Sequence, residues 1–156
     1  DIVSKNKRSE MMSGISSKNT LPELIVRKVL HKAGYRFRLH YKALPGKPDL
    51  VLPKYKLSIF VHGCFWHRHI GCKYAYQPKT RREFWEKKFN TNVTRDQKNI
   101  GNLTKDGWRV LIIWECFIRR ADSSELINSL ETAIHRDDSF YELPLIIKTK
   151  TLDLPV

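Results

Sequence analysis

Apolar residues recur at helical spacing in three stretches of the chain. The first stretch follows Thr20–Glu23, which has the sequence of a capping box, and keeps its spacing until Gly34. A second capping box, Thr80–Glu83, precedes a row that indicates one long or broken helix ending at Gly107; the row consists of Trp85, Phe89, Val93, Asp96, Ile100 and Leu103. A third helix is predicted near residues 123–134.

Four shorter stretches have the pattern of β-strands. Residues 35–41 alternate aromatic or apolar side chains with Arg and His, which is typical of a half-buried strand. Residues 49–52 indicate a short strand, and residues 57–62 are almost continuously apolar, so they are expected in the middle of a sheet. Residues 108–114 are predicted to form another buried strand.

The length of 156 residues suits one domain with its own core. We therefore expect a single α/β domain over residues 20–156, in which a mixed sheet is flanked by helices. The polar and basic residues 1–19 are interpreted as an N-terminal arm, and no role is predicted for the tail 137–156. Residues 63–79 have no usable period and indicate a long loop that something other than a core must hold.

The charge of the chain points to a polyanionic partner. It has 29 Lys and Arg residues against 16 acidic ones, a formal net charge of +13. Nucleic acid is the commonest polyanion bound by so basic a domain, because neutralised phosphates release their counterions. No run of about 18 apolar residues suggests a membrane span. Three cysteines without a signal-peptide pattern favour a reducing cytosol over a disulfide framework.

The loop holds a cluster of candidate zinc ligands. Cys64, His67, His69 and Cys72 lie within nine residues, and Cys116 directly follows the last core strand. A structural zinc ion takes four nitrogen or sulfur ligands in a closed tetrahedron, and three cysteines with one histidine supply that set. The alternative is that the thiols are small buried apolar groups and the histidines ordinary loop residues. The spacing does not decide whether His67 or His69 is the ligand.

A second cluster has the residues of a magnesium nuclease site. Asp49 follows Pro48 at a strand start, and His62 ends the next strand, where such nucleases often have Lys. In such enzymes the aspartate holds the metal and the basic residue faces the scissile phosphate. The alternative is a Pro-Asp turn and a histidine that ends a strand. A loop histidine not needed for zinc can take a proton from water near Asp49, because an imidazole titrates near working pH.

Bulky aromatic residues accompany both clusters. Phe65 and Trp66 are adjacent in the loop, and Trp85 follows at the start of the long helix. Apolar wedges pushed between base steps unstack a duplex locally, which costs less where pairing is already imperfect. The aromatic residues therefore suggest a preference for mismatched DNA. The alternative is that these side chains complete a core over the loop.

Four blocks of this sequence resemble the very-short-patch repair (Vsr) endonuclease family. They are PGKPDLVL, HGCFWHRHIGC, RREFWEKKFNTNVTRD and GWRVLIIWEC, and the similarity covers most of residues 7–120. The resemblance implies a type II restriction-endonuclease-like core, a mixed sheet between helices. It also implies a magnesium-dependent enzyme with a structural zinc ion.

The resemblance implies roles for individual catalytic residues. Asp49 would bind magnesium together with residue 61, which is Val61 here and can contribute only its backbone carbonyl. His67 would be the general base, and His62 the second active-site histidine, near the phosphate. Glu23 aligns with an acidic residue near the active site, although its place in the capping box is a sufficient structural reason for it.

The resemblance also assigns metal and DNA contacts. His69 becomes the zinc ligand, so that the zinc set is Cys64, His69, Cys72 and Cys116. This chain departs from the family by inserting Gly71 and by having Arg68 and Ile70 in place of neighbouring histidines. The residues expected to contact DNA are Phe65, Trp66 and Trp85 as intercalating aromatics, Lys88 and Asn92 near the mispair, and Met12 and Ile15 of the arm in the opposite groove.

These observations lead to one hypothesis and two alternatives. The hypothesis is an enzyme that cuts one strand 5′ to the thymine of a T:G mismatch and so initiates repair of deaminated 5-methylcytosine. The resemblance implies a bacterial cytoplasm, a companion cytosine methyltransferase, and mismatch-repair proteins as further partners; a domain that nicks one strand is expected to be a monomer. The alternatives are a restriction-type endonuclease that cuts paired DNA and a zinc-stabilised DNA-binding module without catalysis.

Overall fold

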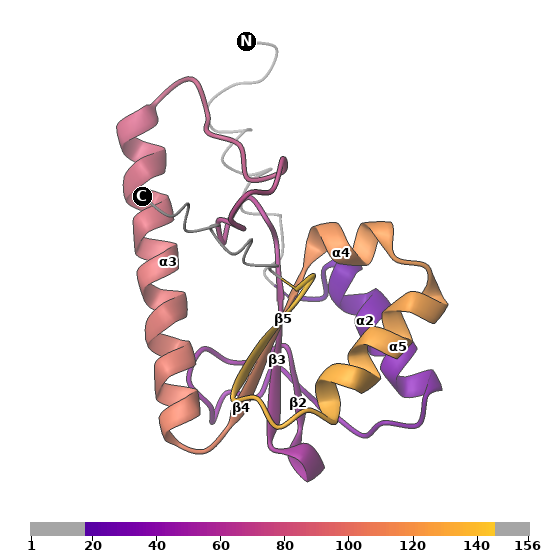
Figure 1. Cartoon of the computed structure of the whole chain (residues 1–156). Helices are drawn as coiled ribbons and strands as arrows, with labels where there is room; N and C mark the ends of the chain where they lie inside the picture. The colour runs from indigo at the N-terminus through magenta and orange to yellow at the C-terminus, as the bar shows by residue number, and fades with distance from the viewer. Residues whose placement is uncertain (1–17, 146–156) are drawn as a thin grey trace, which may run out of the picture.

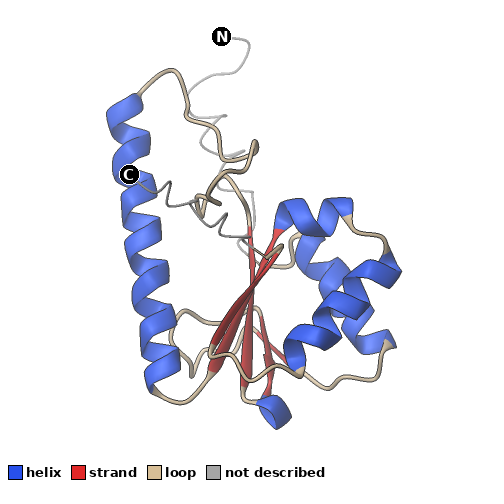
Figure 2. Ribbon diagram, in the orientation of Figure 1, coloured by secondary structure: helices blue, strands red, loops and turns tan. Residues whose placement is uncertain are grey.

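A mixed β-sheet forms the centre of the computed structural model, which describes residues 18–145 (Figures 1 and 2). Its order within the described residues follows the sequence and comprises β1 (Arg38–Leu39), β2 (Leu50–Leu52), β3 (Leu57–His62), β4 (Arg109–Trp114) and β5 (Phe140–Leu143). The first three strands pair antiparallel, and β3, β4 and β5 pair parallel. The expected mixed α/β sheet is therefore confirmed.

Helices cover both faces of the sheet. Helix α3 (Arg82–Lys105) crosses from β3 to β4 on one face, whereas α2 (Leu21–Lys32), α4 (Glu115–Arg120) and α5 (Ser123–Ile134) lie together on the other (Figure 1). A short 3-10 helix, η1 (Pro53–Tyr55), links β2 to β3. None of the described helices is long and apolar enough to cross a membrane.

The alternation of side chains along β3 and β4 builds two cores. Ile59 and Leu111 pack with the group of three helices, whereas Phe60 and Ile112 pack on the α3 side. Successive strand residues point to opposite faces, and because both faces are covered the strands are apolar almost throughout. The same alternation places His62, at the end of β3, on the face that Phe60 shares with α3.

The two capping-box predictions have different outcomes. The Thr20 hydroxyl does accept from the Glu23 backbone N–H at 3.4 Å, but the Glu23 carboxylate turns to other donors. The second capping box is wrong: α3 begins at Arg82, after Arg81 in the left-handed conformation, and without a side-chain cap. This helix end is exposed, so water satisfies its free N–H groups.

Three other elements differ from the sequence-based expectation. The strand expected over 35–41 shrinks to β1, because the backbone turns left-handed at His40 (φ 45°). The long helix α3 is unbroken. Neither α4 nor β5 was predicted, and β5 closes the parallel side of the sheet beside β4.

Candidate active site and metal centre

A cavity of about 510 Å³ lies where β3 ends against α3. Four ionisable side chains line its wall: Asp49, His62, His67 and Asp96. Basic side chains also line it, namely Lys18, Lys47 and Arg95. A carboxylate and imidazole cluster inside a basic rim suits a phosphodiester substrate, because the rim attracts the backbone while the cluster faces it.

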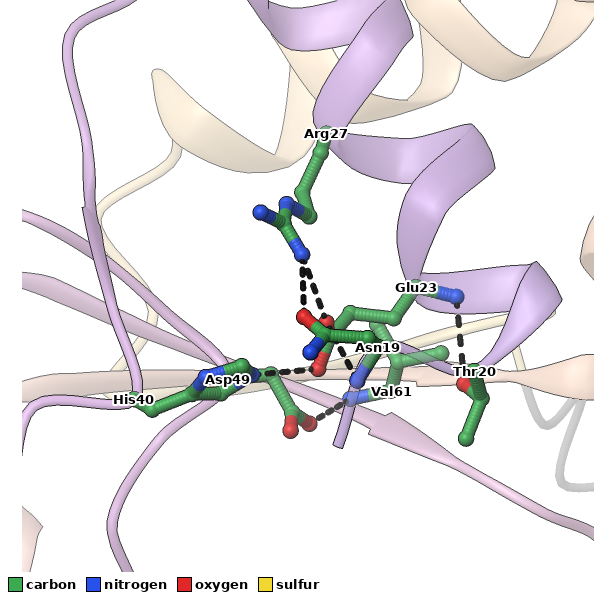
Figure 3. A network of polar contacts seen from close by, with 7 residues as sticks. All are labelled: Asn19, Thr20, Glu23, Arg27, His40, Asp49 and Val61. Carbon is green, nitrogen blue, oxygen red and sulfur yellow. Dashed lines mark hydrogen bonds and ion pairs between the residues drawn. The ribbon is translucent and has the colours of Figure 1, made fainter. Parts of the chain in front are cut away.

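Glu23 is the buried centre of a polar network behind His40 and Asp49, which both line this cavity (Figure 3). Its Oε1 lies 2.9 Å from the Nε2 of His40. Its Oε2 accepts from the Arg27 guanidinium at 3.2 Å and from the Asn19 backbone N–H at 3.1 Å. The exposed fraction of Glu23 is only 1%, so these three donors compensate for the loss of water.

Asp49 lies beside Glu23 and lines the cavity (Figure 3). Its Oδ2 accepts from the Val61 backbone N–H at 2.8 Å, because β2 and β3 are neighbours. Burial and the neighbouring Glu23 carboxylate raise the pKa of Asp49 to about 7, against the lowering effect of the Val61 N–H. Two carboxylates held this close repel each other, and a divalent cation between them removes that repulsion.

His40, Glu23 and Asp49 each offer one ligand atom within 4.8 Å of the others. Carboxylate oxygens are the ligands that magnesium prefers, and it keeps several of its waters when bound. The two carboxylates of this group, Glu23 and Asp49, therefore fit a hard divalent cation, whereas the Nε2 of His40 is already in contact with the Glu23 Oε1.

His67 and Asp96 form a second pair in the cavity. The His67 Nδ1 lies 2.6 Å from the Asp96 Oδ2, and the two side chains are 24% and 16% exposed. A carboxylate can fix the tautomer and orientation of an imidazole through one nitrogen and leave the other free to take a proton. His67 thus has the arrangement of an oriented general base.

His62 stacks directly on His67. Their ring centroids are 3.7 Å apart and their planes 7° from parallel. Burial lowers the pKa of His62 well below its usual value, and the charges of His67 and Arg95 lower it further. The lowered pKa favours the neutral ring of His62 over a second cation beside His67.

The three cysteines and His69 form a separate group next to the ends of β3 and β4. Cys64, His69, Cys72 and Cys116 offer ligand atoms that lie within 4.8 Å of one another. His67, the histidine that spacing left as the alternative, is not in this group.

The His69 Nδ1 lies 3.7 Å from the Cys64 Sγ and 3.4 Å from the Cys116 Sγ. A tetrahedral zinc ion would separate a sulfur and a nitrogen ligand by about 3.6 Å. Burial raises the pKa of the Cys64 thiol to about 12, and also raises that of Cys116, so a bound cation is needed to hold either as a thiolate. The donor set fits zinc.

Trp114, at the end of β4, connects the cysteine cluster to the histidine pair. Its ring stacks on His69 with centroids 4.3 Å apart and meets the edge of His62 at 5.3 Å. Its indole N–H donates to the Glu142 carboxylate on β5 at 2.8 Å. The unpredicted strand β5 therefore supports both centres.

The aromatic residues form a half-buried cluster on the loop and the start of α3. Phe65 is central, with ring centroids 5.2 Å from Trp66, 5.4 Å from Trp85 and 5.1 Å from Phe89. All but Phe89 remain partly exposed. Their packing fits the alternative that they complete a core over the loop. Their exposed parts also fit the expectation that they contact DNA.

Arg68 holds this loop from inside. Its guanidinium donates to the carbonyls of Phe65, Ala75 and Tyr76 and lies 3.9 Å from the centroid of the Phe89 ring. Arg68 therefore connects distant parts of the irregular loop by hydrogen bonds.

The remaining candidate residues have different surroundings. Lys88 is exposed on α3, whereas Asn92 is buried and its amide donates to the Trp66 carbonyl at 3.1 Å. Asn92 thus fixes the position of the aromatic loop. Met12 and Ile15 of the arm lie outside the described residues.

Sequence analysis gave no role to Asp96 and His40, nor to Lys47 and Arg95, two basic residues on the cavity wall. Asp96 was placed in the helical row but given no chemical role, although it is the only charged member of that row. A charge on an otherwise apolar helix face needs a partner, which was the available signal. His40 was not singled out, and only its place nine residues before Asp49 in the turn between two strands could have indicated it.

The fold and the cavity together define a class, a nuclease-like α/β protein with an acid and histidine site. Comparison with known proteins narrows the class. The family model described as DNA mismatch endonuclease Vsr matches residues 1–73. The chain is 44% identical to the DNA mismatch endonuclease Vsr of Escherichia coli over 119 residues, which is 76% of each chain.

Two nicking enzymes are also similar. A type II nicking enzyme of Xanthomonas oryzae is 49% identical over 116 residues, 74% of this chain and 85% of that protein. A type II nicking enzyme of Neisseria meningitidis is 44% identical over 131 residues, 83% of this chain and 93% of that protein. The chain belongs to the Vsr family of DNA mismatch endonucleases. It is a DNA-nicking endonuclease, a hydrolase of phosphodiester bonds.

Proposed function

We propose that this endonuclease nicks duplex DNA 5′ to the thymine of a T:G mismatch and so initiates repair of deaminated 5-methylcytosine. The observation that carries the proposal is the convergence, in one basic cavity, of the Asp49 carboxylate with the His67–Asp96 pair, with the buried Glu23 carboxylate next to Asp49. The aromatic cluster around Phe65 begins three residues after His62, next to the cavity. From there an aromatic wedge would act on a weakened base pair.

Asp49 and the backbone carbonyl of Val61 are the proposed magnesium ligands, with Glu23 as a second acidic group. A bound divalent cation supplies Lewis-acid polarisation of the phosphate. Asp49 is suited to this role because it lines the cavity and the Val61 N–H fixes its Oδ2. Burial is the first cause of the raised pKa of Asp49, so a positive charge bound beside this carboxylate would stabilise its ionised form.

His67 is the proposed general base. Its Nδ1 is engaged by Asp96, so its Nε2 is the atom that would take a proton from the attacking water. His62, buried and neutral, would donate a hydrogen bond to a phosphate oxygen on which negative charge develops. Arg95 and Lys47, on the cavity rim, would orient the neighbouring phosphates.

Zinc is the proposed occupant of the site formed by Cys64, His69, Cys72 and Cys116. Its role would be structural, because all four positions of the tetrahedron are filled by protein. Bound there, it would fix the aromatic loop against the ends of β3 and β4, since Cys64 and Cys116 each follow one of these strands by two residues.

The proposed DNA contacts fall into three groups. Phe65, Trp66 and Trp85 would intercalate beside the mispair, Lys88 would contact it from the exposed face of α3, and Asn92 would act mainly through the loop that it holds. Met12 and Ile15 are proposed to enter the opposite groove. A monomer is the proposed active form, with mismatch-repair proteins as additional partners.

The test uses end-labelled duplexes that differ only at one base pair. We expect nicking with magnesium 5′ to the thymine of a T:G duplex, weaker cutting of the matched C:G and T:A duplexes, and no cutting by the Asp49→Ala protein. Lys54→Ala, an exposed substitution on η1 away from the cavity, is the matched control and should nick normally. Equal cutting of matched and mismatched duplexes would favour the restriction-type alternative, and binding without a nick would favour the non-catalytic module.

A set of T:G duplexes with varied flanking bases then locates the preferred sequence context. Mapping the nick to the nucleotide on each duplex shows which strand is cut. A nick 3′ to the thymine or in the guanine strand would contradict the proposed polarity.

A further inference from the structure

His40 is the one histidine of the cavity wall that has no role in the proposed chemistry. It lies between β1 and β2, and its backbone N–H donates to the Asp49 carbonyl at 3.1 Å. Its φ of 45° is uncommon for a residue with a Cβ, although histidine tolerates it better than most. An unusual backbone conformation held in place beside a site is a reason to ask what the side chain does there.

The ring of His40 points at Glu23, which belongs to a different element (Figure 3). The distance from Nε2 to the Glu23 Oε1 is 2.9 Å, and the His40 side chain is 17% exposed. A carboxylate oxygen only accepts hydrogen bonds, so Nε2 carries the hydrogen. The contact is therefore directional and partly shielded from water, which strengthens it.

The two oxygens of Glu23 have different numbers of donors. Oε2 accepts from both Arg27 and the Asn19 N–H, which uses its two lone pairs. Oε1 accepts from His40, so one lone pair of Oε1 is left. Asp49, whose Oδ2 is fixed by the Val61 N–H, lies on the same side within 4.8 Å. One carboxylate oxygen of Glu23 and one of Asp49 therefore lie close enough to share a cation, and these donors leave at least one lone pair free on Oε1.

We propose that His40 is a positioning residue for the divalent-cation site: through its Nε2–H it sets the Glu23 carboxylate so that Oε1 faces the cation shared with Asp49. This inference rests on the proposed function, because the cation is the one proposed there. His40 acts through Glu23, in the way that outer groups orient ligating carboxylates in other metal sites. It is not itself a ligand, since its Nε2 is committed to Oε1.

The experiment compares two substitutions of similar length, His40→Gln and His40→Met, in the full zinc-replete chain. Glutamine keeps an N–H that can reach Oε1, whereas methionine removes it. Binding of Mn²⁺ is titrated by electron paramagnetic resonance of the free ion, and the Asp49→Ala protein defines which binding belongs to this site. His31→Met, on the exposed face of α2, is the matched control. Thermal unfolding of every variant is recorded beside the titration.

The expected result is Mn²⁺ affinity close to wild type for His40→Gln and about tenfold weaker for His40→Met. His40→Met should have no further effect when Glu23→Gln is already present, because the two residues act as one unit. Equal Mn²⁺ affinities of the Gln and Met variants would overturn the role of His40, as would additive effects in the double variant.

The same titration separates this inference from the proposed function. If wild-type protein shows no Mn²⁺ binding that depends on Asp49, the cation site itself is contradicted and the role of His40 with it. If the Asp49-dependent site is present but the His40 variants bind equally, only the positioning role is wrong. The choice of DNA substrate does not enter either result, so a failure of T:G specificity leaves the inference unaffected.

Discussion

His62 and His67 stack as parallel rings with their centroids 3.7 Å apart. Such closeness would be unfavourable if both rings were cations, because like charges at this distance repel. Burial lowers the pKa of His62, which keeps its ring neutral. In the proposed mechanism His67 would therefore take a proton without facing a second positive ring. The two rings would then have different roles, His67 as the proton acceptor and the neutral His62 as a hydrogen-bonding group for the phosphate.

Asp96 Oδ2 lies 2.6 Å from the His67 Nδ1, and if this contact orients His67 as proposed, the Asp96→Asn protein should nick slowly. We expect a fall in kcat of about a hundredfold or more with unchanged DNA affinity, because the tautomer of His67 is no longer fixed. Single-turnover nicking and a separate DNA-binding measurement check this. Asp106→Asn, at the exposed end of the same helix, is the control. Equal rates for the two variants would contradict the orienting role.

Zinc should be lost when one of its four proposed ligands is changed. The Cys72→Ser protein is expected to purify with far less than the roughly one zinc ion per chain of the wild type. Elemental analysis by mass spectrometry measures the content directly. Wild-type protein that contains no zinc, yet nicks DNA normally, would remove the metal from the proposal.

Trp66 should contribute more to mismatch selection than to catalysis. In the Trp66→Ala protein we expect the ratio of nicking rates on T:G and matched duplexes to fall about tenfold, because less stacking energy is available to hold an opened base step. Phe84→Ala removes an exposed aromatic side chain from the neighbouring helix and serves as a comparison. An unchanged ratio for Trp66→Ala would assign this ring to the core.

Arg68 should stabilise the loop more than its charge alone would suggest. Truncation to alanine leaves the carbonyls of Phe65, Ala75 and Tyr76 without their donor. We expect a loss of about 2 kcal/mol in the free energy of unfolding. Urea unfolding followed by tryptophan fluorescence measures it, with Arg82→Ala at the exposed start of α3 as the control. A loss of unfolding free energy no larger than in that control would show that the hydrogen bonds of Arg68 are dispensable.

Periodic segments of this chain could be predicted, whereas elements fixed by tertiary contacts could not. The apolar run of β3 and the spacing in α5 carry strong local signals, and both elements appear at the expected residues. β5 is half exposed and short, and its place depends on pairing with β4, which no local pattern encodes. The Thr80 capping box failed because the same residues fit a loop that enters α3 through a left-handed Arg81.

The candidate site followed the same division. Residues with distinctive chemistry in short motifs, such as Asp49 and Cys64, were found from the sequence. Asp96 contacts His67, 29 positions away, and His40 contacts Glu23, 17 positions away. The first contact exists only once the loop after β3 has met α3, and the second only once the β1–β2 turn has met α2. A single sequence shows the residues but not which of them become neighbours.

The crossover helix α3 carries Asp96, which contacts His67, whereas the proposed cation site lies on α2 and on the segment between β1 and β2. If α3 detaches in a local opening, the proposed base would lose its contact with Asp96 while the proposed cation site stays in place, so a partly opened molecule should nick DNA poorly. Hydrogen exchange along α3 would report how often this happens. Cleavage would then depend on a docked α3, the same helix that carries Trp85 and Lys88 of the proposed DNA contacts.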